Sequence, residues 1–173
     1  MNYDKICALI GQCVNSIDYT VFADMSKVII IVINEEKRFL KCIDQIITIN
    51  PKIELVLVVQ PSMKGFLKQK YSELYQVIEW VGKYTLGLID VLVKEIRLKD
   101  VDSFLFFSEQ SINMRDQNFM QIAEQIIGKE NSNLRVFGNT IGDEIFEYKN
   151  IRLFNQAIKV YEEMNQLIEI MLE

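Results

Sequence analysis

Two short runs of apolar, mostly β-branched residues constrain the fold of this chain most strongly. "KVIIIVI" at 27–33 and "IELVLVV" at 53–59 have the length of strands and are apolar at nearly every position. Such runs are typical of parallel strands that helices cover on both faces. Residues 35–48 carry apolar side chains at helical spacing and end before Pro51, which disfavours helix in the preceding residue. The first half of the chain therefore predicts a strand–helix–strand unit.

The same alternation continues along the chain. Further strands are predicted at 76–80, 103–107 and 134–138, and further helices at 62–75, 86–96 and 113–127. This pattern predicts an α/β fold, a three-layer α/β/α sandwich around a mostly parallel, five-stranded Rossmann-like sheet of order 3-2-1-4-5. Extra helices are expected at 1–25 and 151–173. With 173 residues, 50% of them hydrophobic, residues 1–173 are expected to form a single domain.

The most favourable place for a ligand on such a sheet is the crevice beyond the carboxyl ends of the strands, where the strand order reverses. Polar residues follow several predicted strands at that edge. The candidate ligand-binding residues are Glu35, Ser62, Glu109, Ser111 and Asn139. Glu35 and Glu109 would face each other across the reversal point, where a carboxylate pair can hold a divalent cation or act as acid and base. The alternative is that these polar residues simply face water, as loops next to strands usually do.

The turn after the first strand does not resemble a phosphate site. It reads Asn34-Glu35-Glu36, without the glycine that admits a phosphate to a helix N-terminus, and its two carboxylates would repel one. The chain contains neither a GxGxxG nor a GxxxxGK[ST] motif, and it has no histidine. We therefore predict no catalytic residue, no metal site and no cofactor, and leave open whether the chain is an enzyme.

Charge and composition narrow the range of partners. Asp and Glu number 24 against 19 Lys and Arg, a net charge of −5, which disfavours nucleic acid as a partner. No apolar run approaches the ~20 residues of a membrane-spanning helix, so no membrane contact is predicted. The three cysteines, Cys7, Cys13 and Cys42, form no CxxC motif; they are expected to be buried and reduced, in keeping with a cytoplasmic location.

One stretch resembles a known family. "KVIIIVINEEKRFLKCIDQIITINPKIELVLVVQPS", followed by "VIEW", resembles the N-terminal Rossmann-like half of two-domain GT-B glycosyltransferases of the heptosyltransferase type, over residues 27–110. In that family the nucleotide sugar is held mainly by a second domain, and the first turn contains glycine. The resemblance therefore implies a lone acceptor-type or vestigial half rather than a competent transferase, and it carries over no catalytic residue.

Two functions follow as hypotheses. The last helix carries an apolar stripe and further apolar residues beside it: the stripe is Leu153, Phe154, Ile158, Tyr161, Met164, Ile168 and Met171, and the others are Val160, Leu167 and Ile170. A helix apolar on more than one side needs more than one cover, so the first hypothesis is a module that acts through protein contacts, as a homodimer through its terminal helices or with an unknown protein partner. The alternative is a small sugar- or nucleotide-binding protein, or a glycosyltransferase-related enzyme, that uses the crevice.

Overall fold

The computed structural model describes residues 2–33, 38–59, 76–79, 92, 98–108, 123–128, 133–139 and 144–172. Its strands are β1 (Val14–Ile17), β2 (Lys27–Ile33), β3 (Glu54–Val59), β4 (Gln76–Glu79), β5 (Ser103–Ser108), β6 (Arg135–Asn139) and β7 (Ile145–Tyr148). Its bounded helices are α1 (Tyr3–Gln12), α2 (Arg38–Ile49) and α6 (Ile151–Leu172), with the 3-10 turns η1 (Tyr19–Asp24) and η2 (Leu98–Asp100). Residues 123–128 are also helical.

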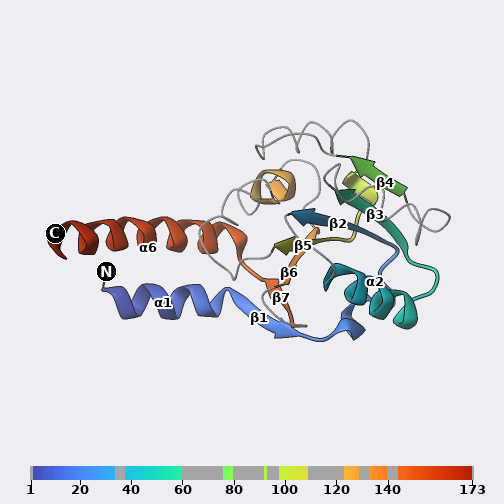
Figure 1. Cartoon of the computed structure of the whole chain (residues 1–173), viewed down its shortest axis with the longest axis horizontal. Helices are drawn as coiled ribbons and strands as arrows, with labels where there is room; N and C mark the ends of the chain where they lie inside the picture. The colour runs from blue at the N-terminus through green and yellow to red at the C-terminus, as the bar shows by residue number, and fades with distance from the viewer. Residues whose placement is uncertain are drawn as a thin grey trace.

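The strands form one sheet of order β1-β7-β6-β5-β2-β3-β4 (Figure 1). From β4 to β6 all neighbours are parallel, and only β7 runs antiparallel to both of its neighbours. The start of the central strand is fixed by Asp102, whose Oδ2 accepts the backbone N–H groups of Ser26 (2.6 Å) and Lys27 (3.0 Å). The chain therefore has an α/β fold with a mostly parallel sheet.

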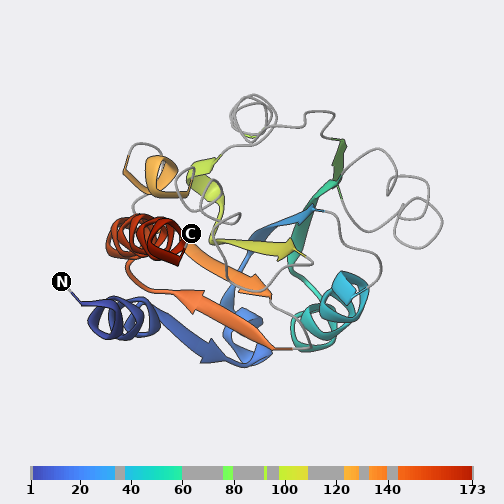
Figure 2. The ribbon, with the colours of Figure 1, turned by 60° about the vertical axis from the view of Figure 1, so that its left-hand side comes forward.

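Helices cover both faces of this sheet. Along β2, alternate residues point to opposite sides, as the period of a strand requires. Ile29 and Ile31 join a core with α6 and the helical residues 123–128, whereas Val28, Ile30 and Val32 join a core with α2 and η1. Figure 2 shows α6 and α2 on opposite sides of the strands. The near-continuous apolar runs of the sequence are thus explained by burial on both faces.

The predicted strand count and order were wrong, because the sheet has seven strands and not five. β1 and β7 extend one edge, next to β6, while the five predicted strands keep their relative order. The predicted helix over 1–25 was also wrong. α1 ends at Gln12, the backbone N–H of Cys13 bonds back to Gly11 and Ile10, and β1 and η1 follow.

The other predictions agree with the structure where it describes them. The predicted strands at 27–33, 53–59, 76–80, 103–107 and 134–138 correspond to β2, β3, β4, β5 and β6, and the long last helix corresponds to α6. The helix predicted at 35–48 is described from Arg38 onward. The predicted helices at 62–75 and 86–96 lie outside the described residues, except for Leu92, which is helical and buried.

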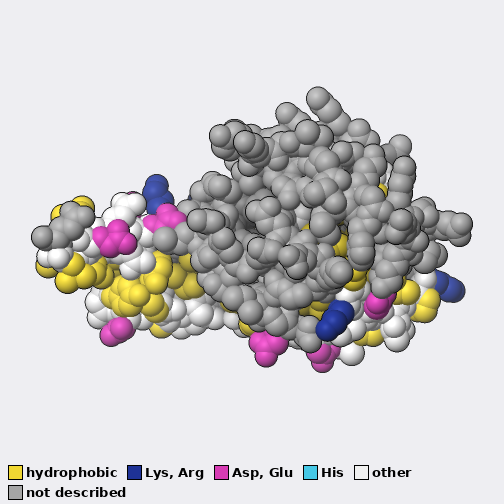
Figure 3. All heavy atoms as spheres, in the orientation of Figure 1, with side chains coloured by type: hydrophobic (Ala, Val, Ile, Leu, Met, Phe, Trp, Pro, Cys, Tyr) yellow, Lys and Arg dark blue, Asp and Glu magenta, His cyan; other side chains and the backbone are white. Residues whose placement is uncertain are grey.

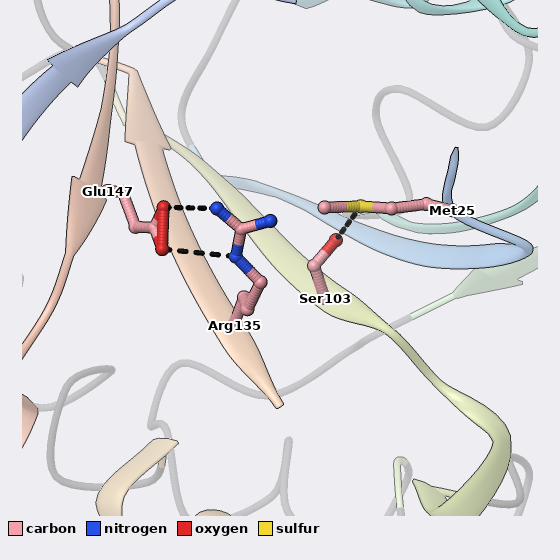
Figure 4. A network of polar contacts seen from close by, with 4 residues as sticks. All are labelled: Met25, Ser103, Arg135 and Glu147. Carbon is pink, nitrogen blue, oxygen red and sulfur yellow. Dashed lines mark hydrogen bonds and ion pairs between the residues drawn. The ribbon is translucent and has the colours of Figure 1, made fainter. Parts of the chain in front are cut away.

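Figure 4 shows two side-chain contacts, of which one ties the antiparallel edge to the parallel sheet and the other lies between β5 and Met25, which precedes β2. Arg135 on β6 makes a bidentate ion pair with Glu147 on β7, with Nε–Oε1 and Nη2–Oε2 distances of 3.0 and 2.6 Å. The paired guanidinium also lies over the ring of Phe137 at 5.2 Å. The buried Ser103 hydroxyl donates to Met25 Sδ at 3.2 Å. The Arg135–Glu147 geometry fixes the orientation of both side chains, which a monodentate lysine could not do.

Gly138 is required by the close approach of Tyr148. A Cβ atom added at Gly138 would lie 2.8 Å from Tyr148 Oη and 2.9 Å from its Cε2. The Tyr148 ring cannot retreat freely, because it packs edge-on against the buried ring of Phe154 at 5.1 Å between centroids. We expect Gly138→Ala to lower the free energy of unfolding by about 1–3 kcal/mol, as overpacking does, in a chemical denaturation experiment.

Gly11 provides the matched control for that prediction. It lies in α1 with open space around the position of a Cβ atom, so Gly11→Ala should raise helix propensity and stabilise by about 0.5–1 kcal/mol. Equal effects of the two substitutions would show that the Tyr148 contact does not constrain position 138.

Candidate functional site

Of the five candidate ligand-binding residues, only Asn139 falls in the part of the chain that the structure describes. It is the last residue of β6 and is 5% exposed. Its Nδ2 donates to the backbone carbonyl of Glu144 at 2.9 Å, which connects the end of β6 to the start of β7. Asn139 is therefore at the predicted edge of the sheet, and this bond of its side chain is structural. The other four candidates, Glu35, Ser62, Glu109 and Ser111, lie outside the described residues and stay predictions.

A cleft of about 530 Å³ opens at the opposite edge, beside the amino end of β6. Its lining residues are Glu124, Ile127, Gly128, Leu134, Tyr148, Lys149, Asn150, Ile151 and Arg152. Nearby, Asn155 of α6 donates to Glu124 Oε2 at 2.8 Å and links α6 to the helical residues 123–128. Asn139, the one candidate that the structure describes, does not line this cleft, and no lining residue was among the predicted candidates.

The second surface of interest is formed by α1 and α6, which leave the sheet side by side and which we call the helical arm (Figures 1 and 2). The two helices run in opposite directions. At the start of α1, the Tyr3 hydroxyl donates to the Tyr161 hydroxyl at 3.2 Å, and the two rings lie 5.5 Å apart. Because α6 continues to Leu172, its last eleven residues, 162–172, extend beyond the contact with Tyr3 by about 16 Å.

A continuous apolar seam runs along α6 and loses its cover where α1 begins. At ~100° per residue, these side chains lie within about 60° of Ile168 around the helix axis: Phe154, Ala157, Tyr161, Met164, Ile168, Met171 and Leu172. Phe154 is 1% exposed, but Ile168 is 45% and Met171 84% exposed. Met164 is half-buried, so the uncovered seam consists of Ile168, Met171 and Leu172.

The end of α6 is apolar on other sides as well. Of the off-stripe residues that were expected to need a second cover, Leu167 and Ile170 are 59% and 66% exposed, whereas Val160 is half-buried. Figure 3 shows hydrophobic side chains exposed along the arm. Cys7 of α1 is exposed too, contrary to the expectation that all three cysteines are buried. The arm is thus the one described region in which large apolar side chains gather on the surface.

The hydrogen bond between Tyr3 and Tyr161 moves the pKa values of the two hydroxyls in opposite directions. Tyr3 donates to Tyr161, and this bond raises the pKa of Tyr3 to about 12. Hydrogen bonds from Tyr3 and from Asn165 lower the pKa of Tyr161. Because an unfolded tyrosine titrates near 10, the stabilisation by the raised group is complete below that pH and is lost as the pH rises to about 12.

This pair can be tested by titration of ring-labelled tyrosines in an NMR experiment. Tyr161 should lose its proton first, and Tyr3 last, with a midpoint near 12. Tyr161→Phe should return the midpoint of Tyr3 towards about 10, because it removes the hydrogen bond to Tyr161 that is the main cause of the raised pKa. An unchanged Tyr3 midpoint in that variant would show that α1 and α6 do not meet through this pair.

Other kinds of site find no support in the described part of the chain. Among its residues no group of three or more Cys, Asp and Glu side chains could hold a metal ion. No described helix is long and apolar enough to cross a membrane. The Glu35–Glu109 pair that was considered for a cation lies outside the described residues.

Comparisons with known proteins identify similar folds only. No family model matches the chain, and no curated protein matches it. Among solved structures it is similar to a Staphylococcus aureus protein provisionally assigned as a caffeoyl-CoA O-methyltransferase, at 10% identity and a TM-score of 0.46, over 95% of this chain and 73% of the other. It is also similar to the mitomycin 7-O-methyltransferase MmcR, at 11% identity and a TM-score of 0.43, over 80% of this chain and 37% of the other.

These matches correct the expected relationship to glycosyltransferases. The two solved structures named above are described as O-methyltransferases, one of them provisionally, and not as GT-B glycosyltransferases. The resemblance over residues 27–110 was therefore wrong, since a strand–helix rhythm is shared by many sheets of this kind. Identities near 10% with TM-scores below 0.5 carry no argument about activity, and function has to be argued from the surface of the molecule.

Proposed function

We propose that this chain is a protein-interaction module that docks through the end of its helical arm. The observation that carries the proposal is the exposed apolar end of α6, where five large side chains are 45–84% exposed: Leu167, Ile168, Ile170, Met171 and Leu172. Side chains of this kind are normally exposed singly, and a contiguous group on one projecting helix is typical of an interaction surface.

The energy available at this surface is of the size that docking requires. Complete burial of one Leu, Ile or Met side chain contributes about 1.5–3 kcal/mol, so the three on the seam, Ile168, Met171 and Leu172, offer roughly 3–6 kcal/mol. Association costs on the order of 4–15 kcal/mol in lost freedom of motion. One arm end therefore supplies a large part of what a complex needs, and a partner that contributes an apolar surface of its own supplies the rest.

The charges on α6 favour a protein over a lipid surface. Helices that lie on membranes carry Lys and Arg on their polar face, where they meet anionic headgroups. The corresponding residues around the end of α6 are Glu162, Glu163 and Glu169. An acidic helix is repelled by an anionic surface, so a protein remains the better partner.

Site-specific photo-cross-linking in living cells tests this proposal without knowledge of the partner. A photoreactive amino acid at position 168, on the seam, should give a discrete protein adduct of higher mass. The matched control is position 166, which is exposed and lies about 160° away around the same helix. Equal labelling from both positions, or no adduct from position 168, would contradict docking through the seam.

A second candidate function is the binding of a small polar molecule at the carboxyl ends of the strands. It is favoured by the placement of a buried amide, Asn139, at that edge, beside which Glu35, Ser62, Glu109 and Ser111 are expected. A ligand at about 100 times its dissociation constant would add ~2.7 kcal/mol to the stability of the folded chain. A thermal-shift screen across nucleotides, simple sugars and divalent cations should then give a hit that Glu109→Ala abolishes, and a flat screen argues against it.

A further inference from the structure

We infer that the partner at the arm is a second copy of this chain, with the two α6 helices packed antiparallel along their uncovered seams and crossing near Ile168. This inference rests on the proposed function, because it assigns the occupant of the same surface. It follows from the shape of the arm, from the placement of its charges and from the self-complementarity of the seam.

The arm leaves one side of the end of α6 uncovered, and a second helix can pack there. Tyr3 at the start of α1 contacts Tyr161, and Met164, one turn further along α6, is still half-buried. Residues 166–172 are all exposed and offer about 10 Å of helix with an apolar seam. The α6 helix of a second copy, packed antiparallel, would run in the same direction as α1 and lie in line with it beyond its amino end. By symmetry, the exposed end of α6 would be covered equally on both copies.

The ends of the helices also favour this arrangement. In the antiparallel pair, the carboxyl end of each α6 points to the amino end of the α1 helix of the other copy. The first carries the negative end of a helix dipole and the second the positive end. Each copy therefore presents the complement of its own surface, as a two-fold interface requires.

The acidic residues of α6 distinguish an antiparallel from a parallel pair of helices. In a parallel pair in register, Glu162, Glu163 and Glu169 would each lie level with the same residue of the other copy, so that like charges meet. In the antiparallel pair centred on Ile168, Glu169 lies level with the neutral Leu167. Glu163 then lies level with position 173 of the other copy, which is also a glutamate, so two like-charged pairs remain where the parallel pair, with position 173 included, has four. Repulsion is therefore lower in the antiparallel pair.

Disulfide trapping of the purified chain tests both the partner and the direction. The background is Cys7→Ser, which removes the exposed native thiol, and Cys13 and Cys42 are buried. Antiparallel packing predicts that Ile168→Cys forms a disulfide-linked dimer under mild oxidation. Met171→Cys alone should give at least about tenfold less, because the two sulfur-bearing residues would be staggered by ~9 Å along the axis, beyond the Cα–Cα reach of a disulfide.

A mixture of two single-cysteine variants completes the test. Met164→Cys and Met171→Cys lie within about 1.5 Å of the same level across the antiparallel pair, so their mixture should cross-link although neither does so alone. Gln166→Cys, on the opposite side of the helix, should not cross-link. Equal cross-linking of Met171→Cys and Ile168→Cys would show a parallel pair and overturn the inference.

The outcomes distinguish this inference from the function on which it rests. A purified chain that stays monomeric and shows no disulfide at position 168, while the photo-cross-linker at that position still captures a different protein in cells, would overturn the second copy as partner and leave the docking function in place. The absence of both the disulfide and the photo-adduct would overturn the docking function as well. A photo-adduct of twice the chain mass of 20.3 kDa together with the predicted disulfide pattern supports both.

Discussion

Replacing Ile168 and Met171 together by glutamine should weaken self-association of the chain by at least about 100-fold, as measured by sedimentation equilibrium. The two side chains are 45% and 84% exposed in one copy and lie on the seam that two copies would share. Loss of about 1–2 kcal/mol from each of four side chains in the dimer exceeds the ~2.7 kcal/mol of a 100-fold change. Since both residues are exposed, folding of the single chain should not suffer.

Ile170→Gln is the matched control for this prediction. Ile170 is also a large apolar residue on the end of α6, at 66% exposed, but it lies about 200° from Ile168 around the axis. Its replacement should change the dissociation constant less than about tenfold. If Ile170→Gln weakened association as much as the double substitution, association would depend on apolar residues on all sides of α6 and not on the seam.

The second large effect is expected at the base of the same helix. Phe154→Ala should lower the free energy of unfolding by about 3–5 kcal/mol, the range for removal of a buried phenylalanine side chain. Phe154 is 1% exposed, packs edge-on against Tyr148 and belongs to the core between α6 and the sheet. Chemical denaturation followed by circular dichroism measures the change.

Ile170→Ala serves as the control, on the same helix and with an apolar residue of similar size. Because this side chain is mostly exposed, its truncation should change stability by less than about 0.5 kcal/mol. The contrast between the two substitutions separates the buried base of α6, which stabilises the fold, from its end, which is available for binding. A small effect of Phe154→Ala would show that α6 is not anchored on the sheet as described.

The central strands could be predicted from the sequence because burial on both faces leaves a continuous apolar run. β2 and β3 are such runs, and they lie where they were expected. β1 has only four residues, "VNSI", and these also continued the helical spacing of α1. Its partner β7 lies about 130 residues further along the chain, and pairing over such a distance leaves no local signal. The edge of the sheet was therefore missed.

The candidate sites differ in how much of each could be predicted from the sequence. The position of Asn139 at the end of a strand followed directly from the predicted strand, but its bond to Glu144 depends on β7, which was not predicted. The apolar stripe of α6 was visible in the spacing of its residues. The point at which its cover ends was not, because it depends on the contact of Tyr3 with Tyr161, 158 residues apart.

The most direct test of the account is hydrogen exchange of the amides of residues 162–172 at two protein concentrations, roughly 100-fold apart and spanning the dissociation constant. A few helical turns without a cover open readily, whereas packing against a second copy should protect them. The account predicts that protection of this segment rises with concentration, while that of β2 stays constant. Fast exchange of residues 162–172 at both concentrations would show that a second copy does not cover the end of α6.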